Sequence, residues 1–224
     1  MKFYLFIFLT FNINSKAQVH PQGFFVSPGI EAVQIGSQVW MRNNLNVVSY
    51  NNGDPILSPT DFGPTSAGAY ADYQNNPSNS NTYGRLYNWY AIVDVRGICP
   101  VGWRVPSETD FVRLTNYLVS GAATGSVNTT YASKAGQYLK EMGFSHWTAP
   151  NTGATDDYRF RAYAAGRKDR SAYGLMGLVA DFWSTTTWTT TTEALRFSLY
   201  YNNIEFARVN TPKYFGLSVR CIQN

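Results

Sequence analysis

Two cysteines constrain the fold of this 224-residue chain more than any other feature. Cys99 lies in the stretch GICPVGWRVPSETDF, directly before an expected helix start, and Cys221 lies three residues from the C-terminus. Two cysteines allow a single intramolecular pair. Closing so long a loop would stabilise the fold by about 4 to 5 kcal/mol in the chain-entropy account. Two free buried thiols are the alternative, because cysteine also packs as a small hydrophobe.

Residues 1–17 have the layout of a secretory signal peptide. Lys2 precedes an apolar run over 3–11, and Ser15-Lys16-Ala17 fits a cleavage site. The run is too short for a bilayer, which takes about 20 residues, and no later stretch is long and apolar enough. An ordinary buried N-terminal strand is the alternative interpretation. We therefore expect a secreted, extracellular or cell-surface protein with no transmembrane segment, in a compartment where disulfides persist.

The polar composition is unusual in relying on neutral groups. Charged residues make up only 14% of the chain and aromatic residues 16%, a balance found more in extracellular binding domains than in cytosolic enzymes. Without Lys2 and Lys16, 16 basic residues face 14 acidic ones. The densest basic stretch, 159–170, also contains Asp169. Nucleic-acid binding needs concentrated positive charge, so no nucleic-acid partner is expected.

The first half of the chain predicts one hairpin and much loop. Residues 18–31 indicate a linker, and alternation across a glycine turn predicts a hairpin over 33–41, its second strand extending through 44–50. Residues 51–82 are rich in Asn, Gly, Pro, Ser and Asp and predict a long loop. For 83–94, periodicity leaves helix and strand open.

The firmest local prediction is a helix that begins after Ser107 and ends at Gly121. Ser107 and Asp110 have the spacing of a capping box, with Asp in place of Glu. Phe111, Leu114 and Leu118 then recur at helical spacing. A second, shorter helix is expected over 132–142.

From residue 158 onward, alternation with a period of two predicts strands. We expect a strand over 158–166, a hairpin over 193–210 that turns at Asn202-Asn203, and a final strand over 214–224. Together these elements predict one α+β domain over 32–224.

Six stretches carry a resemblance to a known family, in order and at suitable distances: VQIGSQVWMRNNLNV, YGRLYNWYA, ICPVGWRVPSETDF, HWTAPNTGATDDYRF, FWSTTTW and YFGLSVRCI. The chain resembles the Fibrobacter succinogenes major paralogous domain family of secreted and surface proteins, from about Ala32 to Gln223. The cysteine-containing blocks around Cys99 and Cys221 are the specific part of the match. The chain departs from the family pattern at RAYAAGRKDR, where a Gly-Gly-Tyr-Arg-like turn is commoner.

The resemblance implies a C-type-lectin-like fold, with two helices packed on a twisted antiparallel sheet and long binding loops. The two cysteines match the long-range bridge of that fold. The family resemblance implies a location and an architecture but no activity.

The residues give little support for an enzyme or a metal site. His20 lies in the linker and His146 in an expected loop, where a packed or surface role is favoured over a catalytic base. Zinc would need more Cys and His ligands than the chain offers. Asp156 and Asp157 could join a calcium site, but the sugar-binding calcium triplets of true C-type lectins are absent. We therefore expect no enzyme activity, no cofactor and no metal.

What remains is a binding surface at the C-terminal hairpins. Tyr and Trp give contact area at low entropic cost, and Asn adapts its hydrogen bonds. Trp183 is expected in the core. The expected ligand-binding residues are Trp188, Tyr200, Tyr201, Asn202, Asn203, Arg208 and Asn210.

The leading hypothesis is a secreted, non-enzymatic binding domain that recognises a glycan or a protein on a surface. The alternative is a structural or assembly subunit of a surface fibre or viral particle, in which the segment before the last strand could be diversified. An enzyme of the formylglycine-generating type is the third, least favoured class.

Overall fold

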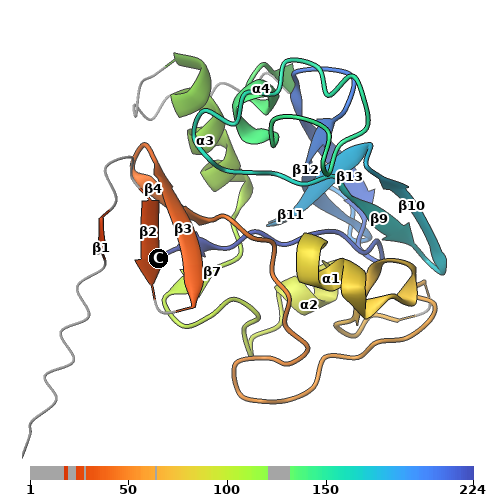
Figure 1. Ribbon diagram of the computed structural model, residues 1–224. Helices are drawn as coiled ribbons and strands as arrows, with labels where there is room; N and C mark the ends of the chain where they lie inside the picture. The colour runs from red at the N-terminus through yellow and green to blue at the C-terminus, as the bar shows by residue number, and fades with distance from the viewer. Residues whose placement is uncertain (1–17, 20–23, 28, 64, 121–131) are drawn as a thin grey trace, which may run out of the picture.

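A computed structural model describes residues 18–19, 24–27, 29–63, 65–120 and 132–224 (Figure 1). The expected signal peptide and Gly121 lie outside these residues. The fold is mixed α+β, as predicted, but it contains two large sheets where one was expected. No helix in the described ranges is long and apolar enough to cross a membrane.

The first sheet joins the two ends of the domain. Its six strands lie in the order β1 (Gln18–Val19), β2 (Phe24–Ser27), β3 (Ile30–Ile35), β4 (Gln38–Met41), β14 (Ile222–Gln223) and β7 (Trp103–Arg104). The β3–β4 hairpin confirms the prediction for 33–41. Strands β1 and β2 and the start of β3 lie in the segment 18–31, so the expected linker is wrong over 18–19, 24–27 and 30–31. Residues 44–50 form no strand, because Leu45 turns toward the C-terminal segment and donates its N–H to Val219.

The second sheet holds the C-terminal hairpins. Its strands lie in the order β10 (Ala172–Met176), β9 (Ala165–Asp169), β11 (Val179–Thr187), β12 (Glu193–Tyr200), β13 (Phe206–Pro212) and β8 (Ala132–Ser133). β12 and β13 confirm the hairpin about Asn202-Asn203. β9 and β11 run parallel, whereas the other pairs run antiparallel.

A third layer of short elements lies below the second sheet in Figure 1 and is drawn in yellow. It comprises η1 (Tyr73–Asn75), α1 (Pro77–Tyr83), α2 (Trp89–Ile92) and the two-stranded sheet of β5 (Tyr70–Ala71) and β6 (Leu86–Tyr87). The expected loop over 51–82 therefore ends in ordered elements. The undecided segment 83–94 contains both the strand β6 and the helix α2.

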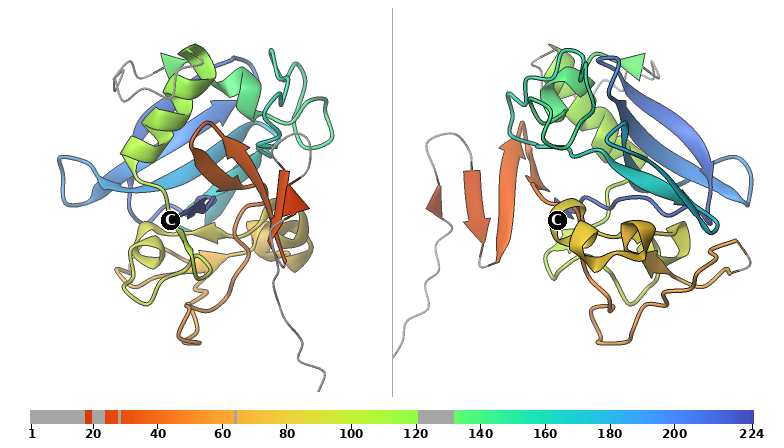
Figure 2. Two further views of the ribbon diagram at one scale, coloured as in Figure 1. Left: turned by 90° about the vertical axis from the view of Figure 1, so that its left-hand side faces the viewer. Right: turned by 45° about the vertical axis from the view of Figure 1, so that its right-hand side comes forward.

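The predicted helix after Ser107 is confirmed as α3 (Glu108–Ser120). Its start is a reciprocal cap: the Ser107 N–H donates to Oδ2 of Asp110 (2.8 Å), and the Asp110 N–H donates to Oγ of Ser107 (3.4 Å). Phe111, Leu114 and Leu118 are buried, as their spacing predicts. They pack in one core cluster with residues of both large sheets, and Figure 2 shows α3 against these sheets.

The second helix is much shorter than predicted. Only α4 (Gly136–Leu139) is helical within 132–142, and Ala132–Ser133 is the edge strand β8. Lys140 is extended and buried, and its ammonium donates to the carbonyls of Thr152, Tyr200 and Asn203 at 2.8–3.0 Å. These bonds tie the β12–β13 turn to the end of α4 and stop the helix there.

The alternation over 158–166 does not form a strand. Arg159 and Arg161 have left-handed φ values of 56° and 53°, which break the extended conformation. The alternation does mark burial, because Phe160 and Ala162 lie in the core. The strand β9 begins only at Ala165.

The C-terminal segment passes through the middle of the molecule. The Leu217 and Tyr87 backbones exchange hydrogen bonds, Ser218 bridges to Phe182, and Ile222 pairs with Trp40. The expected continuous strand over 214–224 is therefore divided among several partners, which include Lys168 and Arg104 as well, and only β14 is regular. Cys99 and Cys221 form the predicted disulfide, with Cα atoms 6.1 Å apart. It holds this central segment to the start of the 99–107 stretch.

Candidate functional site

The seven residues expected to bind a ligand lie at two ends of the β12–β13 hairpin. At one end, the Arg208 guanidinium lies 4.8 Å from the Trp188 ring and pairs with Glu108 at 2.5 Å. Asn210 donates its amide to Glu193 at 3.0 Å. Much of the hydrogen-bonding capacity of this group is used inside the protein.

At the other end lie Tyr200, Tyr201, Asn202 and Asn203. Two backbone carbonyls of this turn hold the buried Lys140 ammonium, and the Tyr201 ring packs against the main core. Asn202 is exposed. The structure therefore does not bring the seven expected residues into one site, although Asn202 stays accessible.

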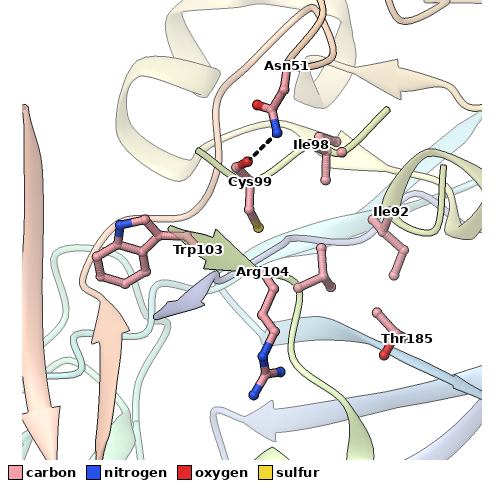
Figure 3. A pocket seen from close by; sticks show the side chains of 9 residues that line it. Asn51, Ile92, Ile98, Cys99, Trp103, Arg104 and Thr185 are labelled. Atoms are coloured by element: carbon pink, nitrogen blue, oxygen red, sulfur yellow. Dashed lines mark hydrogen bonds between the residues drawn. The ribbon is translucent and has the colours of Figure 1, made fainter. Parts of the chain in front are cut away.

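A hollow of about 380 Å³ lies beside the disulfide (Figure 3). We call it the disulfide hollow. It is lined by Asn51, Ile92, Gly97, Ile98, Cys99, Trp103, Arg104, Val105 and Thr185.

The polar groups of the disulfide hollow already have partners inside the protein. The Asn51 amide donates to the Cys99 carbonyl at 2.9 Å, as the dashed line in Figure 3 marks. Arg104 forms two bonds to the Asp110 carboxylate, at 2.6 and 2.8 Å. Although burial alone would raise it, the pKa of Asp110 is lowered, because Arg104 and Ser107 donate to the carboxylate. This hollow therefore offers a ligand apolar wall, as from Ile92 and Val105, beside polar groups that already have partners.

The second hollow lies between the segment after β4, the end of α1 and residues 161–163. We call it the asparagine cleft. It is lined by Asn43, Asn44, Asn46, Ser80, Asn81, Thr82, Gly84, Arg161 and Tyr163.

Local sequence explains how α1 reaches this cleft. The Asn76 side chain caps the helix by accepting from the Ser78 N–H at 3.1 Å, and Pro77 occupies the first turn. Gly84 ends the helix at φ 75°, and a Cβ there would lie 2.7 Å from Cβ of Asn44. Only glycine lets the end of α1 approach the 43–46 segment so closely.

Asn44 forms the fixed floor of the cleft. Its amide donates to the Tyr83 carbonyl at 2.8 Å, and its oxygen accepts from Nε and Nη2 of Arg220 at 3.0 and 2.8 Å. The neighbouring Asn43, Asn46, Asn81 and Thr82 are exposed. The floor is therefore rigid, whereas the rim carries accessible amides and a hydroxyl.

An aromatic group closes one side of the cleft. The Tyr163 ring stacks on His146 at 3.9 Å, and Tyr83 meets both rings edge-on. Nδ1 of His146 lies 2.7 Å from Oε2 of Glu141, which fixes the imidazole. His146 is thus a packed residue, as expected, and it supports Tyr163. Burial raises the pKa of Tyr163, so its hydroxyl is a neutral hydrogen-bonding group at pH 7.

Asp156 lies beside the cleft on a left-handed turn with φ 50°. Its Oδ1 accepts from the Arg161 N–H at 2.7 Å. Burial raises the pKa of Asp156 to about 6, although Arg42, Arg220 and Arg161 oppose the shift. Within the described ranges, no group of three His, Cys, Asp or Glu side chains is placed to hold a metal ion.

The cleft residues were not among those expected from the sequence. Asparagines recur in RNNLN and SNSNT, but such runs are typical of ordinary loops. Arg161 and Tyr163 lie in the alternating segment 158–166, which predicts a strand. Only the fold brings the three segments together. A usable signal was the concentration of Asn without the Gly and Asp that turns usually carry.

This architecture, an α+β domain closed by one long-range disulfide, agrees with the comparison with known families. The family model of the Fibrobacter succinogenes major domain matches residues 33–223, and the chain belongs to this family. The resemblance seen in the sequence is thereby confirmed. Neither the curated proteins nor the solved structures contain a match to the chain.

Proposed function

We propose that the protein is an exported, non-enzymatic binding domain that holds a glycan in the asparagine cleft. The observation that carries this proposal is the set of accessible amides, from Asn43, Asn46 and Asn81, around a rigid floor and an aromatic wall. Oδ1 of Asn43 accepts from Arg161 and Oδ1 of Asn46 accepts from Arg85, but the N–H donors of all three amides are left to pair with sugar hydroxyls. A cleft of about 380 Å³ is within the range of small-molecule sites.

Export is part of the proposal. A disulfide of 122-residue separation persists where the compartment is oxidising, and residues 1–17 read as a signal peptide. The C-type-lectin-like arrangement implied by the family resemblance is also proposed. The mixed α+β class, the long irregular segments and the bridge near the C-terminus support it.

The alternative, a structural or assembly subunit, has one observation in its favour. Val95 and Val101 are 101% and 93% exposed, near the disulfide hollow. Exposed apolar side chains mark a contact surface where they gather in one contiguous patch. This reading places the functional surface on the 93–101 segment and leaves the asparagine cleft without a ligand.

A glycan array tests the proposal. The protein without residues 1–17 is compared with an Asn81→Ala, Tyr163→Ala variant of the cleft and a Tyr201→Ala, Asn202→Ala variant of the hairpin turn. We expect defined glycans to be bound, with the cleft variant weakened at least about tenfold, since two or more hydrogen bonds and an aromatic contact are lost. The hairpin variant should bind nearly as the parent does.

Each contrary pattern has a distinct meaning. Loss of binding only in the Tyr201→Ala, Asn202→Ala variant would move the site back to the hairpin predicted from the sequence. Absence of binding to every glycan, with all variants folded by circular dichroism, would reject the glycan and favour the assembly role.

A further inference from the structure

We propose that the asparagine cleft selects an acidic saccharide and that Arg161 binds its carboxylate. This inference rests on the proposed function, because it names the class of glycan that the same cleft takes. Neutral amides explain how sugar hydroxyls are held. They do not explain why a cationic side chain forms part of the wall.

The hydrogen-bonding capacity of Arg161 is only partly used. Its Nη2 donates to Oδ1 of Asn43 at 3.1 Å, and the Glu31 carboxylate is 3.9 Å away, at the limit of an ion pair. Nε of Arg161 is buried and has no hydrogen-bond acceptor in the part of the chain that the structure describes. A guanidinium carries five donors in a fork that matches a carboxylate. Because Nε is covered by protein atoms, an anion in the cleft would be held by the terminal nitrogens of the partly exposed guanidinium.

The backbone holds Arg161 in an unfavourable conformation. The residue has φ 53°, and Arg159 and Asp156 are also left-handed, at 56° and 50°. For a residue other than glycine this conformation costs about 1 kcal/mol or more. The bond from the Arg161 N–H to Asp156 stabilises the turn and directs the side chain to the cleft. Strain of this kind is concentrated at functional sites.

A buried cation lies behind the cleft floor. Arg220 is 1% exposed, and its guanidinium donates to Asn44 and to the carbonyls of Phe160 and Met41. No described carboxylate forms an ion pair with it. Burial lowers the pKa of Arg220 to about 9, so it remains protonated at pH 7. Its field reaches the cleft through Asn44 in a region that water screens poorly.

The local charge balance is positive. Among the described carboxylates, Glu31 and Asp156 lie near Arg42, Arg161 and Arg220. Asp72 and Glu141 also border the cleft, at Ser80 and Tyr163, but they pair with Arg85 and His146. An anion bound in the cleft would neutralise part of this excess positive charge. The accessible amides favour a saccharide over an acidic peptide or free phosphate, because they supply several positions for hydroxyl groups as well as one for the carboxylate.

The test uses an array of matched pairs: uronate- and sialate-containing oligosaccharides, and the same compounds as methyl esters. Esterification removes the charge and keeps the sugar. We expect the parent protein to bind the acids about tenfold or more tightly than the esters, as for a charge-assisted bidentate contact. The preference should fall as ionic strength rises from 0.05 to 0.5 M.

Three variants separate a direct role of Arg161 from a structural one. Arg161→Gln should remove the preference for acid over ester while weak ester binding persists. Arg161→Lys should keep part of the preference, since it keeps the charge and loses the fork. Arg104→Gln, at the disulfide hollow, is the matched control and should change neither.

The outcomes distinguish this inference from the proposed function. Equal binding of acids and esters, with the esters still sensitive to Asn81→Ala, would overturn the inference and keep the glycan site. A preference for acids that survives in Arg161→Gln, or a pentaglutamate peptide that binds as tightly as the uronates, would also overturn it. No binding to any member of the array would reject the proposed function and the inference together.

Discussion

The disulfide hollow and the asparagine cleft have the same volume, about 380 Å³, but differ in how their polar groups are paired. In the first, Arg104 and Asn51 find their partners inside the protein, in Asp110 and the Cys99 carbonyl. In the second, Nε of Arg161 and the side-chain N–H groups of the rim amides have no partner among the described residues. Unmet hydrogen-bonding capacity, rather than volume, therefore distinguishes the two hollows. On this difference rests our proposal of a structural role for the disulfide hollow and a recognition role for the asparagine cleft.

The largest expected effect on stability comes from removing the disulfide. Replacing both cysteines, Cys99→Ser and Cys221→Ser, should lower the free energy of unfolding by about 4 kcal/mol, because the bridge closes a loop of 122 residues. For a chain of this size, that corresponds to a fall in Tm of roughly 10 °C. Calorimetry of the double variant and of the reduced parent measures it. Below the transition, glycan binding should be unchanged, and its loss would show that the two hollows are not independent.

The next largest expected effect is the difference in stability between variants of two arginines, Arg220 and Arg104. Arg220→Met leaves Oδ1 of Asn44 and two buried carbonyls without their donor, and should cost about 3 kcal/mol. Arg104→Met removes a side chain that is 44% exposed and should cost about 1 kcal/mol or less. Urea denaturation of both variants gives the difference. Equal losses would mean that Arg220 does not organise the cleft floor as described.

The smallest expected effect is the pH dependence of stability that two carboxylates, Asp110 and Asp156, contribute. The pKa of Asp110 is lowered in the folded state, so its contribution is present above its ordinary value of 3.8 and is lost as pH falls through the folded pKa. The pKa of Asp156 is raised to about 6 in the folded state. Its contribution to the stability is therefore complete below pH 3.8 and is lost as pH rises through 6.

Replacing each carboxylate by asparagine should therefore change the stability in opposite directions. Asp110→Asn should lower the stability by about 1 kcal/mol at pH 7, with less effect near pH 3, since a cap and an ion pair are lost. Asp156→Asn should raise Tm relative to the parent more at pH 7.5 than at pH 4.5, because asparagine cannot ionise. Melting curves across this pH range check both signs. A parallel response of the two variants would contradict the contrast between the hollows.

The sequence predicted the parts of the fold that depend on local signals. The capping box at Ser107, the Gly36 turn of the first hairpin and the Asn202-Asn203 turn each specify their geometry within a few residues. The failures came where tertiary contacts override the local pattern. Lys140 ends a helix through three distant carbonyls, and Arg161 adopts a left-handed conformation inside an alternating pattern.

The candidate site was less predictable than the fold. Its walls come from residues 43–46, 80–84 and 161–163, which no periodicity connects. The aromatic and polar composition of the hairpin did predict surface-type residues, but most of them bind one another, as Arg208 does with Trp188 and Glu108. Composition alone does not show which hydrogen bonds are already made.

The most direct test of the account is to map where a saccharide touches the protein. ¹⁵N-labelled protein without residues 1–17 would be titrated with a mixture of neutral and acidic oligosaccharides of two to six sugars, and amide shifts followed by NMR. The account predicts changes in the side-chain amides of Asn43, Asn46 and Asn81 and in the backbone of 161–163. Changes confined to 97–105 or to 201–203, or none at all, would contradict it.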